Sequence, residues 1–173
     1  MEMKEFYYEN GIRVSLFNLD HEAVPFHFHQ SVSDMIFCSK GTIQIELPEK
    51  KKVYTVAQGN VFQIPSRTKH RFANGEQHGR QSRYVLMQLG SFDIEFEQDT
   101  ESMQALLPSA KPKHESKTPI YIENRKADIQ ALASRFAKNR PEALTEEENR
   151  DVVMALEYFA AKGVESVYSD EKV

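Results

Sequence analysis

The spacing of apolar residues divides the chain into two parts. From residue 5 to residue 97, short segments rich in Val, Ile, Phe and Tyr are separated by Gly, Pro, Asn and Ser. In residues 42–47 polar and apolar positions alternate strictly, which places Ile43, Ile45 and Leu47 on one face of a strand. The other predicted strands are residues 13–17, 34–38, 53–56, 61–64, 70–74 and 84–89. Many short strands separated by turn residues are typical of an all-β sandwich or barrel.

After residue 119 the apolar spacing becomes that of amphipathic helices. A stripe with the 3.6-residue period predicts a helix over residues 125–139, which ends before Pro141; the stripe consists of Ile129, Leu132, Ala133 and Phe136. A second helix begins at the capping box Thr145–Glu148, with Gly163 as its predicted C-cap. Residues 98–119 are irregular and rich in proline, with a short helix predicted within 101–107. We therefore expect a barrel at 1–97, a linker at 98–119 and a helical extension at 120–173.

Composition and charge narrow the class of protein. The chain has 173 residues, of which 40% are hydrophobic and 28% charged, and its formal net charge is -4. This is an ordinary globular composition, and an acidic balance argues against nucleic acid as the main partner. Because no apolar run approaches the roughly 20 residues that span a bilayer, and the first residues lack the apolar core of a secretory signal, we expect a cytoplasmic protein without a membrane partner. The one cysteine, Cys38, excludes an internal disulfide and is expected to be a buried structural thiol.

Three histidines and one aspartate carry the candidate chemistry. His27 and His29 are two residues apart in an extended segment, so both imidazoles leave the same face. In an uninterrupted strand Asp34 would face the opposite side, but the intervening Ser-Val-Ser can turn the chain and return it to the same interior. His70 opens another predicted strand. Two imidazoles and a carboxylate form the facial triad of non-haem iron sites, and a third histidine suits Fe, Mn, Ni, Cu or Zn almost equally well. The alternative is a set of hydrogen-bonded histidines in a polar barrel mouth without metal.

The same residues lie in two stretches that resemble the cupin family. The first cupin motif, H-x-H, three or four residues, Glu, six residues, Gly, is similar to His27–Gly41, and the second, G, five residues, P-x-G, two residues, H, three residues, N, is similar to Gly59–Asn74. Two positions differ from the motifs: Asp34 stands where the family has Glu, and Arg67 where it usually has Gly. The resemblance covers roughly residues 10 to 95.

This resemblance implies a mainly β fold, the double-stranded β-helix or jelly roll, here with a C-terminal two-helix extension. It implies that one divalent transition metal is held inside the barrel, with Fe2+ favoured over Mn2+, Ni2+, Zn2+ or Cu2+. The implied ligands are His27, His29, Asp34 and His70. It further implies that Gly41, Gly59 and Pro65 form turns, that Asn74 supports a turn, and that the protein forms a homodimer.

Two functional hypotheses follow, because this fold hosts many reactions. The first is a metal-dependent enzyme acting on a small organic substrate, of the dioxygenase type or, second, an isomerase. The alternative is a sensor that binds a sugar or another effector without turnover. Tyr84 and Gln88 are candidates for the pocket wall, although both faces of their strand carry apolar residues. Arg71 and Arg83 are candidate anion holders, and solvent-exposed positions are favoured for both.

Overall fold

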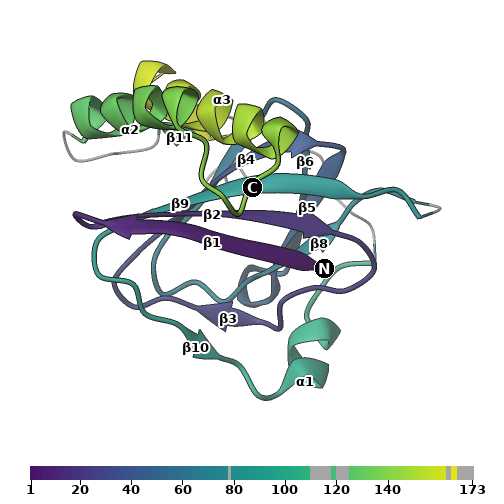
Figure 1. Cartoon of the computed structure of the whole chain (residues 1–173). Coiled ribbons are helices and arrows are strands. Elements are labelled where there is room, and N and C mark those ends of the chain that lie inside the picture. The colour runs from purple at the N-terminus through teal and green to yellow at the C-terminus, as the bar shows by residue number, and fades with distance from the viewer. Residues whose placement is uncertain (78, 110–117, 120–124, 163–164, 167–173) are drawn as a thin grey trace.

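The computed structural model describes residues 1–77, 79–109, 118–119, 125–162 and 165–166. Its β-strands form a barrel, and two helices lie side by side across the outside of one sheet (Figure 1). The short helix α1 (Thr100–Ala105) lies at the opposite end of the molecule from this helix pair (Figure 1). The mainly β fold with a C-terminal helix pair, predicted from the sequence, is confirmed.

The larger sheet has five antiparallel strands in the order β1-β2-β9-β4-β7. In that order the strands are Glu2–Glu9, Ile12–Leu19, Ser82–Leu89, Asp34–Lys40 and Val61–Ile64. Apart from β1 and β2, neighbours in this sheet are far apart in the sequence, since β9 lies between β2 and β4. The sheet thus brings residues of the first predicted motif next to a strand that lies outside both motifs.

The opposite wall consists of a three-stranded sheet and a short strand pair. The three-stranded sheet has the order β6-β5-β8, with bounds Lys52–Ala57, Thr42–Leu47 and Arg71–Asn74. The pair consists of β10 (Glu95–Phe96) and β3 (His27–Phe28). A 3-10 turn at Pro48–Lys50 joins β5 to β6. Because β3 also bridges to His70, just before β8, it closes this side of the barrel.

Side chains of the central strands alternate between two apolar cores, one on each face of the five-stranded sheet. On β9, Val85 and Met87 pack toward the helices, whereas Tyr84 and Leu86 belong to the core inside the barrel. The strands β2 and β4 alternate in the same way. Successive side chains of a strand point to opposite faces, so every second residue of these strands points into the barrel. Both faces are apolar because helices cover the outer one, which explains why the sequence left the orientation of residues 83–89 open.

The helices α2 (Lys126–Lys138) and α3 (Glu146–Lys162) cover the outer face of this sheet (Figure 1). The predicted stripe of α2 is buried there; it consists of Ile129, Leu132, Ala133 and Phe136. The predicted capping box begins α3: the Thr145 backbone N–H donates to Glu148 Oε1 at 2.8 Å, and the Glu148 N–H donates to Thr145 Oγ1 at 3.1 Å. Gly163, the predicted C-cap, lies outside the described residues. Two further short strands, β11 (Thr118–Pro119) and β12 (Glu165–Ser166), pair with each other in antiparallel orientation.

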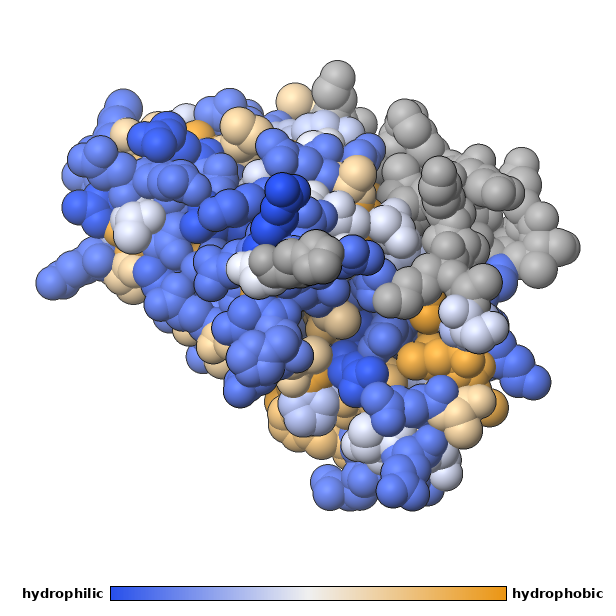
Figure 2. Space-filling model, turned by 90° about the vertical axis from the view of Figure 1, so that its right-hand side faces the viewer, coloured by the Kyte–Doolittle hydropathy of each residue, from blue (hydrophilic) through white to orange (hydrophobic). Residues whose placement is uncertain are grey.

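The surface is polar over most of the side shown in Figure 2, and apolar side chains gather in its lower part. Within the described part of the chain, no helix combines the length and the apolar character needed to span a bilayer.

Candidate metal centre and adjoining cavity

The structure brings all four predicted ligands together inside the barrel. The cluster consists of His27, His29, Asp34 and His70; all four are buried, and their candidate ligand atoms lie within 4.8 Å of one another. His27 lies on β3, Asp34 opens β4, and His70 immediately precedes β8. The chain between His29 and Asp34 is not a strand, so Asp34 returns to the interior as predicted.

Backbone hydrogen bonds fix the two histidine-bearing segments against each other. The N–H of His27 donates to the carbonyl of His70 at 3.1 Å, and the N–H of His70 donates to the carbonyl of His27 at 2.9 Å. The N–H of Arg67 donates to the carbonyl of His29 at 2.6 Å. Residues from the two predicted motifs therefore meet through the main chain as well as through their side chains.

Each imidazole is held by its Nδ1 atom. Nδ1 of His27 lies 2.7 Å from the carbonyl of Pro25, Nδ1 of His29 lies 2.6 Å from that of Asp93, and Nδ1 of His70 lies 2.7 Å from that of Thr68. A carbonyl oxygen only accepts, so each Nδ1 carries the proton that it donates. In a neutral imidazole this leaves the lone pair on Nε2. An outer hydrogen bond of this kind sets the orientation and tautomer of metal-binding histidines.

Asp34 supplies the negative charge of the cluster. Its Oδ2 lies 2.9 Å from Nε2 of His70 and its Oδ1 lies 3.2 Å from Nε2 of His29. Burial raises the pKa of Asp34, but the contacts with His29 and His70 outweigh burial and hold this pKa well below its usual value. The carboxylate is therefore ionised at neutral pH.

The histidines differ in their own protonation. Burial and the neighbouring His70 lower the pKa of His27 to about 4, so its imidazole is neutral at physiological pH. Burial also lowers the pKa of His29, but the Asp34 carboxylate raises it by more, and the net shift is upward. A metal at this centre would therefore compete with a proton at His29 more than at His27.

The donor set and its geometry fit a divalent transition metal. Nε2 of His29 is buried and has no hydrogen-bond partner among the described residues, since its contact with Asp34 lacks the angle of a hydrogen bond. Two ligand atoms, each about 2.1 Å from one metal ion, are at most about 4.2 Å apart. The 4.8 Å spread of the cluster needs only a small contraction to meet this limit. Three imidazoles and a carboxylate suit Fe, Mn, Ni, Cu or Zn.

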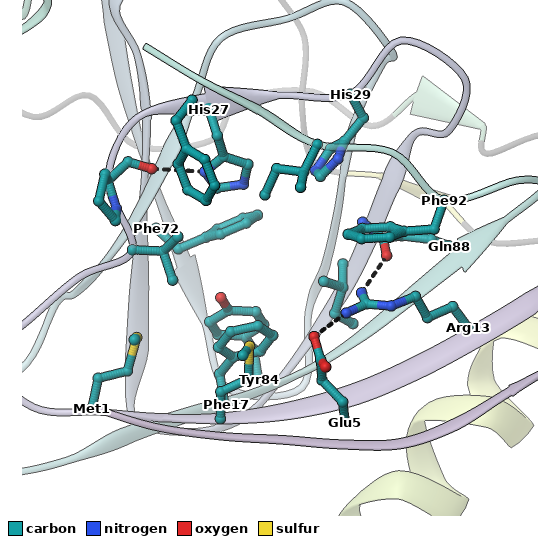
Figure 3. Close-up of a pocket in the computed structure, with 16 residues that line it drawn as sticks. Met1, Glu5, Arg13, Phe17, His27, His29, Phe72, Tyr84, Gln88 and Phe92 are labelled. Atoms are coloured by element: carbon teal, nitrogen blue, oxygen red, sulfur yellow. Dashed lines mark hydrogen bonds and ion pairs between the residues drawn. The ribbon is translucent and has the colours of Figure 1, made fainter. Parts of the chain in front are cut away.

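A cavity of about 340 Å³ adjoins the cluster (Figure 3). His27 and His29 belong to its wall. The apolar part of the wall consists of Met1, Met3, Phe17, Val24, Pro25, Phe72, Leu86, Phe92, Ile94 and Phe96. Its other polar residues are Glu5, Arg13, Tyr84 and Gln88. The predicted placement of Tyr84 and Gln88 at the pocket wall is confirmed.

A hydrogen-bonded chain runs from the cavity wall to the cluster of three histidines and Asp34. Arg13 forms an ion pair with Glu5 and donates from Nη1 to Gln88 Oε1 at 2.7 Å. Gln88 in turn donates from Nε2 to Asp34 Oδ1 at 2.6 Å. The ring of Phe92 covers the Arg13 guanidinium, with 3.9 Å from Cζ to the ring centroid. The roles of Glu5, Arg13 and Phe92 were not predicted from the sequence. The available signal was that Arg13 lies an even number of residues from Phe17, which faces the interior from the same strand.

The prediction that Arg71 and Arg83 are solvent-exposed was wrong. Arg83 is only 8% exposed, because its side of β9 faces the helices. Its Nη1 lies 2.8 Å from Asp151 Oδ2 and 3.0 Å from Glu147 Oε1, so the guanidinium binds α3. Arg71 is half-buried and forms a 2.6 Å ion pair with Glu46. Since both charges are used within the fold, neither residue is an anion holder.

Two smaller predictions are confirmed. Asn74 supports a turn, because its Nδ2 donates to the carbonyl of Arg80 at 2.7 Å and its Oδ1 accepts from the Glu76 N–H at 2.9 Å. Cys38 is buried inside the barrel core, and burial raises the pKa of its thiol to about 12.

Comparison with known proteins agrees with the fold and the motifs. The sequence model of the cupin domain family matches residues 16–80. This match covers most of the barrel and includes both motifs, so residues 16–80 resemble a cupin domain. No curated protein sequence matches the chain.

Several solved structures are similar to the barrel. The polyketide cyclase RemF from Streptomyces resistomycificus is 19% identical, with a TM-score of 0.47, over 56% of this chain and 74% of the cyclase. A cupin 2 conserved barrel domain protein from Rhodopseudomonas palustris is 16% identical, with a TM-score of 0.48, over 61% of this chain and 77% of that protein. An uncharacterized protein with a double-stranded beta-helix domain from Klebsiella pneumoniae is 13% identical, with a TM-score of 0.46, over 51% of this chain and 71% of that one.

Proposed function

We propose that the protein is a metal-dependent enzyme that acts on a small organic molecule in the barrel cavity. The observation that carries the proposal is the cluster itself: three imidazoles anchored through Nδ1 and one ionised carboxylate converge beside a mostly apolar cavity. Fe2+ is the favoured metal, with Mn2+, Ni2+, Zn2+ and Cu2+ as the other members of the same class.

A bound divalent metal would supply Lewis-acid chemistry or a site for dioxygen next to the substrate. The residues of the chain have separate tasks around it. His27 and His29 lie at the cavity wall. Asp34, which belongs to the cluster but not to this wall, supplies the compensating negative charge. Gln88 fixes the direction of the Asp34 carboxylate. Dioxygenase-type oxidation is the favoured reaction because a histidine-rich site suits Fe2+, and isomerisation is the second candidate.

The apolar wall supports a substrate site that excludes water. Ligand cavities typically have apolar walls with a few placed polar groups, and this wall has that composition. A non-catalytic sugar sensor would need many hydrogen-bonding side chains toward the cavity, and the described wall offers few. The sensor hypothesis is therefore retained only as an outcome of the test.

Metal content tests the proposal directly. We expect the purified protein to hold about one equivalent of transition metal per chain, and His27→Ala and His70→Ala to lose nearly all of it. His21→Ala is the matched control, because His21 is exposed and lies outside the cluster. Elemental analysis measures the metal, circular dichroism checks that each variant is folded, and oxygen consumption with phenols, thiols and keto acids tests for oxygenase activity. Full metal retention in both cluster variants would contradict the proposal, and metal-free protein that binds a sugar would favour the sensor.

A further inference from the structure

Tyr84 places a hydroxyl in the cavity wall, which also contains His29, whose Nε2 has no hydrogen-bond partner in the described part of the chain. Tyr84 is 1% exposed and lies on the interior face of β9. In Figure 3 its hydroxyl points into the cavity, across from His27 and His29. No hydrogen bond joins this hydroxyl to another of the described residues. A hydroxyl that lines a cavity and forms no hydrogen bond within the fold can donate to, or accept from, a ligand in that cavity.

Neighbouring rings fix the direction of this hydroxyl. The ring of Phe17 stacks on that of Tyr84, with centroids 4.7 Å apart and an interplanar angle of 8°. Phe72 contacts the same ring, with centroids 4.9 Å apart. A tyrosine that contacts two rings of the core cannot swing away from the cavity without disrupting these contacts, so its hydroxyl is preorganised.

The charged groups of the wall are already satisfied. Arg13 is paired with Glu5, hydrogen-bonded to Gln88 and covered by Phe92. A substrate carboxylate or phosphate would have to break this ion pair to reach the guanidinium. Aromatic and aliphatic side chains make up most of the remaining wall. The cavity therefore favours a neutral molecule with an apolar body.

We propose that the substrate is a small neutral aromatic molecule with one hydroxyl or carbonyl oxygen, which the Tyr84 hydroxyl binds and orients. The inference rests on the proposed function, because it names the substrate class of the same site. Tyr84 is a positioning residue: it sets the direction of the substrate within the cavity beside His27 and His29. The aromatic body packs against the rings of Phe72 and Phe92, which line the same space.

Matched probes separate the contribution of the hydroxyl from that of the apolar wall. 2-Naphthol has a neutral aromatic body with one hydroxyl, naphthalene lacks the hydroxyl, 2-naphthoate replaces it with a charge, and glucose represents a sugar effector. Affinities are measured by equilibrium dialysis on the protein as purified. We expect 2-naphthol to bind more tightly than 2-naphthoate or glucose.

Tyr84→Phe removes only the hydroxyl and keeps the ring contacts with Phe17 and Phe72. We expect it to weaken 2-naphthol binding about threefold to tenfold, the equivalent of one net hydrogen bond, and to leave naphthalene binding unchanged. Tyr158→Phe, on α3 and outside the cavity wall, is the control and should change neither affinity.

Three results would overturn the inference: unchanged 2-naphthol binding in Tyr84→Phe, an equal loss of naphthalene and 2-naphthol binding, or tighter binding of 2-naphthoate or glucose. The metal content of the same samples keeps the two proposals separate. Metal-containing protein that binds no neutral aromatic overturns this inference alone. Metal-free protein whose 2-naphthol binding depends on Tyr84 overturns the enzyme proposal and leaves the role of Tyr84 in the cavity standing.

Discussion

The side-chain amide of Gln88 donates a 2.6 Å hydrogen bond to Oδ1 of Asp34, from the strand next to the one that begins with Asp34. The amide cannot turn around, because its oxygen accepts from Arg13 at 2.7 Å and a guanidinium only donates. Gln88 therefore always presents its N–H groups to the carboxylate. A residue of the cavity wall thus sets the orientation of the Asp34 carboxylate.

Replacing Gln88 should weaken metal binding without removing a ligand. Gln88→Leu keeps the approximate volume but leaves Asp34 Oδ1 without its hydrogen bond, and losing such an outer contact typically costs about tenfold to a hundredfold in metal affinity. Competition against a chromophoric chelator measures the affinity. Gln58→Leu, at an exposed turn position, is the control. An unchanged affinity in Gln88→Leu would show that Asp34 needs no support from β9.

A second prediction concerns the attachment of the helices to the barrel. Glu148 of α3 is 3% exposed and accepts hydrogen bonds from Lys4 at 2.6 Å and from Asn18 at 2.9 Å. Burial raises the pKa of Glu148, but the bonds from Lys4, Thr145 and Asn18 lower it by more, to about 2. Because the folded pKa lies below the ordinary value of 4.5, the ionised carboxylate stabilises the fold above pH 4.5, and this contribution is lost as the pH falls toward 2.

Glu148→Gln should therefore lower the free energy of unfolding by about 1–3 kcal/mol at pH 7, and by less at pH 3. Urea denaturation at both pH values measures the difference. Glu146→Gln is the matched control, because Glu146 is exposed in the same first turn. If the loss in Glu148→Gln is as large at pH 3 as at pH 7, the carboxylate charge is not its source.

Much of the fold was predictable because local patterns and tertiary packing agree. The strict alternation at 42–47 matches β5, and the apolar stripe and the capping box match α2 and α3. The four residues of the cluster were predictable because they stand at fixed spacings in two short motifs. Strand β1 is missing from the predictions because its alternation is weak: most of its residues are exposed or only half-buried.

The cavity wall was less accessible to sequence reasoning. Ile94 and Phe96 reach it because β10 pairs with β3, across more than 60 residues of chain, and no local period records that pairing. Glu5 and Arg13 enter through an ion pair between neighbouring strands. The placement of Arg83 depends on α3 covering the outer face of the sheet, which makes a charged residue an internal contact. These features depend on contacts between separate strands and helices, which the local sequence pattern does not record.

The single thiol offers a third test. Sγ of Cys38 lies inside the barrel core, 3.4 Å from the carbonyl of Gly41, and burial raises its pKa to about 12. Since the thiolate is the reactive form, native Cys38 should react with a disulfide reagent at pH 8 at least about a hundredfold more slowly than the unfolded chain. The chain has one cysteine, so absorbance reports this site alone. Equal rates with and without urea would show that the core opens around Cys38 in the native protein.

A final prediction concerns the backbone of Arg67, beside the candidate metal ligand His29. Arg67 has a φ of 62°, in the left-handed region, while its N–H donates to the carbonyl of His29. A side chain in that region costs about 1–2 kcal/mol, and glycine loses about 0.5–1 kcal/mol more backbone entropy on folding than alanine. Arg67→Gly should therefore stabilise the protein by up to about 1 kcal/mol and raise Tm by about 2–4 °C.

Ser66→Gly is the control for this substitution, because Ser66 is also exposed but does not have a positive φ. It gains no relief from strain and should lower stability by about 0.5–1 kcal/mol. Metal affinity should stay the same in Arg67→Gly, since the N–H that holds His29 belongs to the main chain. Thermal unfolding compares the two variants, and a lower Tm in Arg67→Gly than in the original protein would mean that contacts of the Arg67 side chain outweigh its backbone strain.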